Sequence, residues 1–283
     1  MTIKQSDTPL RRFAQQRPVV TFFILAYSLG WIAFLPLVLS NTGLGVVPIN
    51  VPFEFSMLGV STPTLAALWT HWLIHRNFRI CRFSTSWRRL LAGCLMGVVV
   101  VMLAFVILPS ILLVKGSPRA LHWTALSAAW VYWSNPLNLL GGPLNEEPGW
   151  RGFALPRLQQ RFGPLMGSTL LGLLWAGWHV PLFFVQEWLS VPWWAFTMLM
   201  LCQSIFMTWG TNLSEGSIIV PMLMHASFNS SFPLLFALCQ DLPTRGRFLP
   251  YYLSAAAAIA IATILLTRGR LGIPKLIAVR HSA

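Results

Sequence analysis

The chain has 283 residues, of which 55% are apolar and only 10% are charged, with 14 Trp and 19 Phe. This composition excludes an ordinary soluble domain. The net charge is +13, but the basic residues gather in short segments between apolar runs, which argues against nucleic-acid binding. The cysteines are far apart and include no C-x-x-C pair, which argues against both a disulfide framework and a thiolate metal site.

Eight apolar runs are long enough to cross about 30 Å of hydrocarbon. In chain order the predicted spans are 18–40, 56–75, 90–114, 121–141, 164–185, 192–213, 217–238 and 248–267. The first has a basic flank like that of a signal peptide, but its apolar part is longer than a signal core, so we expect it to remain uncleaved. The sequence therefore predicts an all-α, polytopic membrane bundle of about eight transmembrane helices, forming a single domain over residues 1–283.

The distribution of basic residues predicts the orientation of this bundle. If both termini lie on one side, 16 of the 20 Lys and Arg residues lie on that side as well. Short cytoplasmic segments accumulate Lys and Arg, so we expect both termini in the cytoplasm and the chain in a plasma membrane, with an excess of Arg over Lys that hints at a bacterial source. The segment around Glu146, which includes Arg151, is expected to face the cytoplasm near the membrane surface.

Glu146 and Glu147 stand side by side in the segment NEEPGWRGFALPRL, residues 145–158. Adjacent carboxylates in a low dielectric resist ionising together, so one of them can be held ready to accept a proton. The alternative interpretation is structural: Glu147 caps a short interfacial helix that begins at Pro148 and pairs with Arg151.

Two histidines lie well inside apolar runs, where an ionisable group is costly. Trp175 precedes His179 by four residues, and His225 precedes Asn229 by four, so each pair projects from one helix face. Each histidine could instead bond a neighbouring helix as a structural contact. Amide hydrolysis needs an activated water, a proton carrier and oxyanion donors, which carboxylate, His and Asn side chains can supply. The sequence lacks H-E-x-x-H and G-x-S-x-G motifs.

As an ordered set, E-E-x-x-x-R, aromatic-x-x-x-H and H-x-x-x-N resemble the CPBP family, which includes CAAX prenyl endopeptidases and bacteriocin-processing, ABI-like proteins. The resemblance covers about residues 140–232, the expected catalytic core. It implies an intramembrane endopeptidase with a cavity open to the cytoplasm. Its substrate would be a membrane-associated or lipidated peptide, cleaved in CAAX-type or leader-peptide processing, and its other partner would be membrane lipid.

The resemblance also implies a role for each motif residue. Glu146 and His179 would activate water, and His225 and Asn229 would hold the oxyanion. In support, Arg151 would position Glu147 or the substrate. Trp175 stands where the family more often has Phe, and this bulkier ring puts the size of the substrate in doubt.

Three points remain open from the sequence. Zinc could be bound by Glu146, His179 and His225, although Asn229 beside His225 favours chemistry without a cofactor. A transporter or proton relay, and a non-catalytic immunity or scaffold protein, are alternatives to the protease. In addition, counting 1.5 Å per residue from the expected helix starts puts His179 about 22 Å deep and His225 about 12 Å deep, with Glu147 near the surface.

Overall fold

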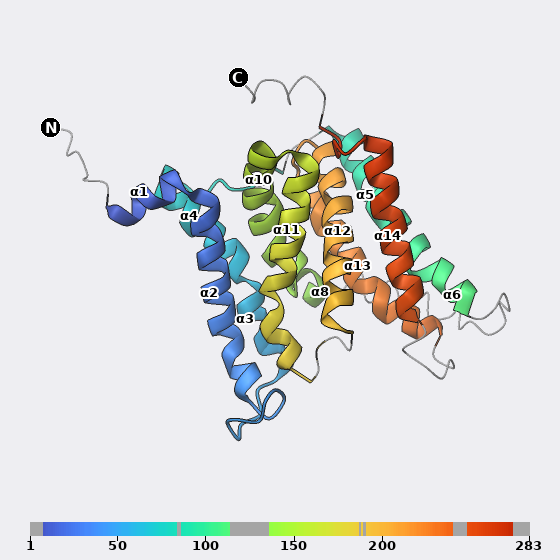
Figure 1. The fold of residues 1–283 in the computed structure, drawn as a ribbon, viewed down its shortest axis with the longest axis horizontal. Coiled ribbons are helices and arrows are strands. Elements are labelled where there is room, and N and C mark those ends of the chain that lie inside the picture. Colours follow the sequence, from blue (N-terminus) through green and yellow to red (C-terminus); the bar gives the residue numbers. More distant parts are fainter. Residues whose placement is uncertain are drawn as a thin grey trace.

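The computed structural model describes residues 8–83, 86–113, 136–186, 188, 191–239 and 248–273. Within these ranges every regular element is a helix, and extended pairing is limited to one isolated bridge between Arg82 and Ser217. Figure 1 shows the long helices lying side by side as a bundle. The predicted all-α class is therefore confirmed.

Four described helices are long and apolar enough to cross a membrane. They are α2 (Pro18–Leu39), the continuous helix of α5 (Trp87–Met102), η2 (Leu103–Ile107) and α6 (Leu108–Leu113), then α13 (Ile219–Leu238) and α14 (Phe248–Thr267). Large apolar side chains cover their outer faces, as Leu265 and Leu266 do with exposed fractions of 70% and 76%. Such a surface suits lipid rather than water, in agreement with an integral membrane protein.

Helices that are shorter or less apolar occupy most of the other predicted spans. These are α3 (Ser56–Val60) with α4 (Thr62–His75), α11 (Pro164–Trp178) with the 3-10 helix η5 (Val180–Phe184), and α12 (Trp193–Leu213). Most of the predicted span 121–141 lies outside the described residues, with α8 (Pro136–Leu140) at its end. Two further elements precede α8 in the chain, namely α1 (Pro9–Gln16) and the 3-10 helix η1 (Phe53–Phe55). The count of eight transmembrane helices therefore stays a prediction.

Residues 143–162 differ from the expected polar connection. They form one continuous helical segment composed of α9 (Pro143–Glu147), the π-helix η4 (Pro148–Ala154) and α10 (Leu155–Phe162). Glu146 and Glu147 are 3% and 0% exposed, so they are not solvated loop carboxylates, while their depth relative to the membrane surface stays a prediction. Arg151, counted with the cytoplasmic arginines, is buried as well. The charges can be buried because they are paired with one another and with hydrogen-bond donors.

This segment enters the bundle because its backbone comes very close to α4. A methyl group on Gly149 would lie 2.5 Å from the carbonyl carbon and oxygen of Pro63, so only glycine fits there.

Elsewhere in the bundle, α11 packs tightly on α12 through small polar residues. Ser204 Oγ donates to the Ser168 carbonyl at 2.9 Å, and Thr208 Oγ1 donates to Ser168 Oγ at 2.9 Å. Such small-residue contacts are typical of membrane helix pairs.

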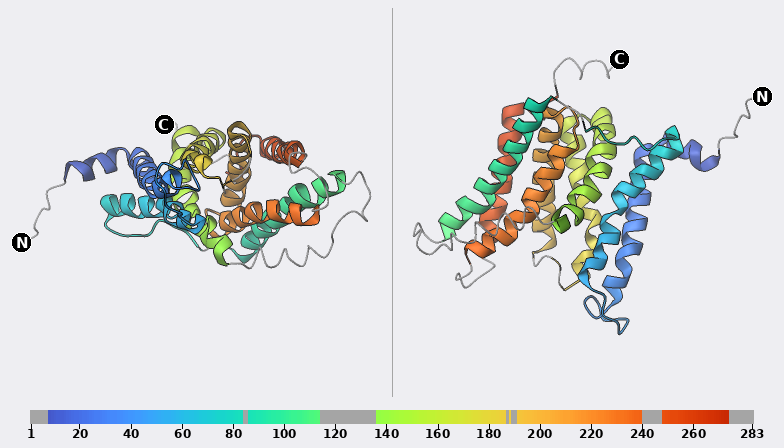
Figure 2. Two further views of the ribbon diagram at one scale, coloured as in Figure 1. Left: turned by 90° about the horizontal axis from the view of Figure 1, so that it is seen from below. Right: turned by 180° about the vertical axis from the view of Figure 1, so that it is seen from behind.

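The views in Figure 2 show α2 beside α4 at one side of the molecule and α5 beside α13 at the other. In Figure 1 the start of α2 and the end of α14 lie at the same, upper end of the bundle. The segments with most of the described arginines, which are α1, the connection after α4, α10 and the residues after α14, also lie at this end. We predict that this basic end faces the cytoplasm.

Candidate functional site

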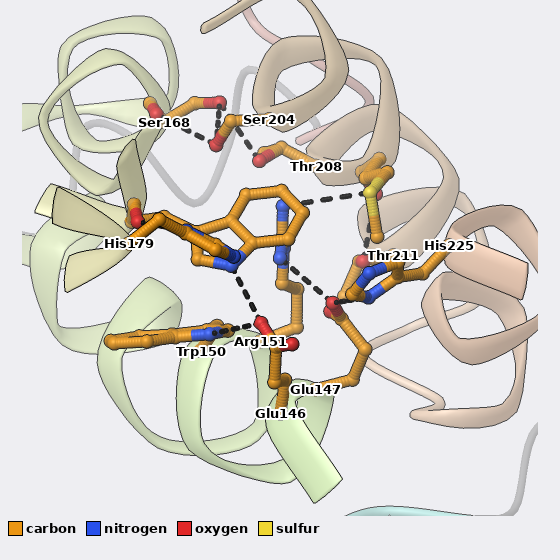
Figure 3. A network of polar contacts seen from close by, with 12 residues as sticks. Glu146, Glu147, Trp150, Arg151, Ser168, His179, Ser204, Thr208, Thr211 and His225 are labelled. Carbon is orange, nitrogen blue, oxygen red and sulfur yellow. Dashed lines mark hydrogen bonds and ion pairs between the residues drawn. The ribbon is translucent and has the colours of Figure 1, made fainter. Parts of the chain in front are cut away.

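The structure brings the predicted site residues together in the interior of the bundle. Glu146 and Glu147 lie at the end of α9, His179 follows the last residue of α11, and His225 lies in α13. Figure 3 shows these side chains around Arg151. The carboxylates and the histidines are all buried. Asn229, one turn after His225, is exposed toward the cavity that it lines.

Glu146 is held through only one of its two carboxylate oxygens. Its Oε2 accepts hydrogen bonds from Trp150 Nε1 at 3.1 Å and Trp175 Nε1 at 2.7 Å. Trp150 lies four residues after Glu146, on the same helix face. Two indole donors therefore fix the orientation of the carboxylate and leave Oε1 available for another partner.

Glu147 is held by charged and ionisable partners instead. Its Oε1 accepts from Arg151 Nη1 at 2.9 Å and from His225 Nδ1 at 2.8 Å. Since a carboxylate oxygen only accepts, Nδ1 of His225 carries the hydrogen, and the bond turns Nε2 to the opposite side of the ring. The Arg151 guanidinium carbon lies 4.3 Å from the centroid of the Trp175 ring, so the cation also stacks on an aromatic face.

Gly142, which precedes α9, marks the point where the three motifs meet. A methyl group built on Gly142 would lie 3.2 Å from Glu146 Oε1, 3.2 Å from His225 Nε2 and 3.3 Å from Asn229 Nδ2. The free carboxylate oxygen, the free imidazole nitrogen and the amide nitrogen therefore surround one small region. The absence of a side chain at position 142 keeps that region open.

His179 is anchored by its own helix and by aromatic rings. Its Nδ1 donates to the carbonyl of Trp175 at 2.8 Å, which leaves a lone pair on Nε2 when the ring is neutral. Its ring stacks on Trp188 at a centroid distance of 5.8 Å. The Trp175 ring lies 6.1 Å from the His179 ring and 5.1 Å from the His225 ring, between centroids. The large difference in depth that helix counting suggested is therefore wrong, because one indole is close to both histidines.

The histidines and Asn229 open onto a cavity of about 800 Å³. Its walls come from α11, α12, α13 and α14 and are largely apolar and aromatic, with contributions from Trp188, Phe196, Phe228, Phe232, Phe248 and Tyr252. Its polar lining includes His179, His225, Asn229 and Gln203. A site with few polar groups at one part of an apolar cavity suits a ligand that carries both an apolar chain and a polar group.

The proposed zinc ligands are not arranged as a metal site. Within the described residues, no group of three His, Cys, Asp or Glu side chains is placed to hold a metal ion. Glu146 Oε2 accepts from two indoles and Glu147 Oε1 accepts from His225, whereas Glu146 Oε1 is free and lies near His225 Nε2. In the described part of the chain, Glu146, His179 and His225 are therefore not assembled as a three-ligand centre.

Sequence reasoning missed Trp150 and Gly142. The spacing of four residues between Glu146 and Trp150 is a signal that could have indicated the indole donor. No spacing in the sequence indicates the role of Gly142, because this role depends on where α13 contacts α9.

The protein is an all-α membrane bundle in which buried Glu and His side chains meet an Asn side chain that faces a cavity. Residues 128–231 match the family model of type II CAAX prenyl endopeptidase Rce1-like proteins. The chain is also 34% identical over 107 residues to CAAX prenyl protease 2 of Methanococcus maripaludis. That alignment covers 34% of this chain and 38% of the relative, so the chain matches well under half of that protein's length. Both comparisons support the resemblance to the CPBP family that the motifs carry, and the family model spans the segment that holds the site.

Proposed function

We propose that the chain is an intramembrane endopeptidase that cleaves a membrane-associated or lipidated peptide by direct attack of water. The observation that supports this most is the convergence of Glu146 Oε1, His225 Nε2 and Asn229 Nδ2 within 3.3 Å of one point. The apolar cavity beside them would hold the lipid or apolar part of the substrate. The name of the archaeal relative favours a prenylated CAAX-type peptide, and a leader peptide is the alternative.

In this proposal Glu146 is the general base. Its Oε2 is engaged by two indoles, so Oε1 takes the proton from the attacking water while the water oxygen bonds to the carbonyl carbon. The carbonyl electron pair moves to oxygen and forms an oxyanion. His179, whose Nε2 lone pair is free, accepts this proton from Glu146 and delivers it to the leaving amine, so that Glu146 is again able to act as a base.

His225 and Asn229 hold the oxyanion. The Asn229 amide nitrogen donates one hydrogen bond, and a hydrogen on His225 Nε2 supplies the other. Glu147 and Arg151 are positioning residues, since they act through His225. Collapse of the intermediate breaks the C–N bond and yields a carboxylic acid and an amine.

The test uses purified full-length chain in lipid nanodiscs and three peptides: a farnesylated CAAX-type peptide, its unprenylated form and an apolar leader peptide. We expect cleavage of at least one peptide by the wild type, and loss of cleavage in Glu146→Gln and His179→Ala. Glu54→Gln and His75→Ala are the matched controls, because these residues are exposed and lie outside the site.

Equal cleavage by Glu146→Gln and the wild type would contradict the proposal. So would a wild type that cleaves none of the peptides but moves ions or solutes across liposomes in a Glu146-dependent way, because that result favours a transporter. A chain that binds a membrane partner equally well with and without Glu146, and cleaves nothing, would be a scaffold.

A further inference from the structure

Three arginines converge on a groove that is separate from the catalytic cavity. The groove has a volume of about 640 Å³ and lies where α1, α2 and α10 meet. Its polar lining consists of three guanidinium groups and two amides, from Gln16, Arg17, Arg157, Gln160 and Arg161. The first apolar residues of α2, including Val19, form the rest of the wall.

The positive charge of this groove has no acidic partner in the described part of the chain. The ion pairs found there join Arg89 to Glu215 and join Glu147 to Arg151 and His225, none of which lines the groove. An anion that enters the groove therefore meets three cations that are not already neutralised.

Arg157 is also held in place before any ligand binds. Its Nη1 donates to the carbonyl of Phe153 at 2.8 Å, and its guanidinium carbon lies 3.8 Å from the centroid of the Phe153 ring. Burial lowers the pKa of Arg157, and a bound anion would favour its charged form. A preorganised guanidinium loses less conformational freedom on binding than a mobile one.

The position of the groove indicates which anion it takes. Arg17 directly precedes α2, one of the helices apolar enough to cross a membrane, and Val19 and Val20 are among its first residues. The arginines therefore lie where lipid headgroups meet hydrocarbon, at the basic end seen in Figure 1. A phosphate would lie against the guanidinium groups, and its acyl chains would follow the apolar surface of α2.

We propose that this groove binds the phosphate of an anionic phospholipid. The test is native mass spectrometry of the full-length protein titrated with phosphatidylglycerol, phosphatidylcholine or inorganic phosphate. Arg17→Gln/Arg161→Gln removes two groove cations and leaves the anchored Arg157 in place. Arg79→Gln/Arg88→Gln removes the same charge from exposed positions outside the groove and is the matched control.

We expect the groove variant to bind phosphatidylglycerol about tenfold more weakly than the wild type, as the loss of two arginine contacts predicts, and the control variant to bind it within about twofold. Equal losses in the two variants would overturn the proposal, because they would reflect net charge alone. Equal affinity of the wild type for phosphatidylcholine would also overturn it. Binding of inorganic phosphate as tight as that of the lipid would assign the groove to a free anion instead.

A second observation concerns Gln203, and the inference from it rests on the proposed function. Gln203 lies in α12, is 7% exposed and lines the catalytic cavity. Within the described residues no hydrogen bond to its amide is found, and the side chain faces the cavity. An occupant of the cavity can therefore supply both a donor and an acceptor for this amide.

We infer that Gln203 is a positioning residue that hydrogen-bonds the peptide backbone of the substrate. Its neighbours on the cavity wall, Leu199 and Met200, are apolar and cannot do so. Gln186 also lines the cavity, but it is exposed and can be satisfied by water. Gln186→Leu is therefore the matched control for Gln203→Leu.

The test measures peptide binding in the Glu146→Gln background, so its outcome does not depend on cleavage. We expect Gln203→Leu to weaken binding of the peptide about tenfold, as loss of one hydrogen bond predicts, and to leave binding of free farnesol unchanged. In the active background the loss should appear in KM rather than kcat, and Gln203→Asn should restore part of it. Unchanged peptide affinity, or an equal loss in Gln186→Leu, would refute the inference.

Discussion

The two halves of the buried site hold neighbouring carboxylates in different ways. Glu146 is held by neutral indole N–H groups and keeps one oxygen free, whereas Glu147 is bonded to a guanidinium and an imidazole. A carboxylate with a free oxygen and neutral partners can take up a proton without leaving a buried cation unpaired. Glu147 cannot, because Arg151 depends on it. In the proposed mechanism the two identical side chains therefore have different roles: Glu146 acts as the base, and Glu147 stabilises the buried guanidinium.

The largest effect on kcat/KM is expected for substitution of Glu146. Glu146→Gln removes the base and should lower kcat/KM by about 10³-fold, within the range for loss of a general base. The melting temperature should change little, because glutamine keeps an oxygen that accepts from the indoles and no ion pair is broken. Kinetic assays and thermal unfolding in the same detergent measure both quantities. A large loss of stability would show that Glu146 is structural as well.

The second-largest effect is expected for substitution of Glu147, and it should lower the stability of the fold as well as the activity. Glu147→Gln leaves Arg151 buried and unpaired, which costs about 3 to 5 kcal/mol. The melting temperature should fall, and kcat/KM of the remaining folded protein should fall about 10²-fold because His225 loses its orienting partner. Glu147→Gln/Arg151→Met, which removes both charges, should recover much of the stability but not the activity. If the double variant were as unstable as the single one, the ion pair would not be the cause.

A smaller effect is expected from the indoles. Trp175→Phe and Trp150→Phe each remove one hydrogen bond to Glu146 Oε2, which amounts to about 1.5 kcal/mol for a charged acceptor, or about tenfold in kcat/KM. The two variants should lose kcat/KM to a similar extent, since both remove a donor to the same oxygen. Wild-type kcat/KM in both would mean that the indoles only pack against the carboxylate.

The smallest effect is expected from chelation. The site side chains do not form a three-ligand cluster in the described residues, so we predict that chelator treatment of the purified protein changes kcat/KM by less than about twofold. Metal analysis of the same sample is the control. Activity that is abolished by the chelator and restored by zinc would contradict the prediction.

Much of this fold could be predicted from the sequence, because apolar length determines which segments can cross a membrane. The positions of α2, α12, α13 and α14 follow from this physical requirement. The burial of residues 146–151 could not be predicted in this way. Two glutamates and an arginine make that segment polar in sequence, and only the pairing between Glu147 and Arg151 shows how it can lie inside.

The candidate site was predictable as a set of residue types but not as a geometry. The spacing of four between Trp175 and His179, and between His225 and Asn229, indicates shared helix faces. Counting residues from helix starts did not predict that the Trp175 ring lies near both histidine rings. The contribution of Gly142 depends on contact between α9 and α13, which local sequence does not encode.

The substitution Gly142→Ala tests the central claim most directly, because its methyl group would occupy the point where Glu146, His225 and Asn229 meet. We predict that kcat/KM falls at least about 10²-fold, as expected for displaced reacting groups, while the melting temperature stays near that of the wild type. Wild-type kcat/KM in a folded Gly142→Ala protein would contradict the account, because chemistry would then occur elsewhere.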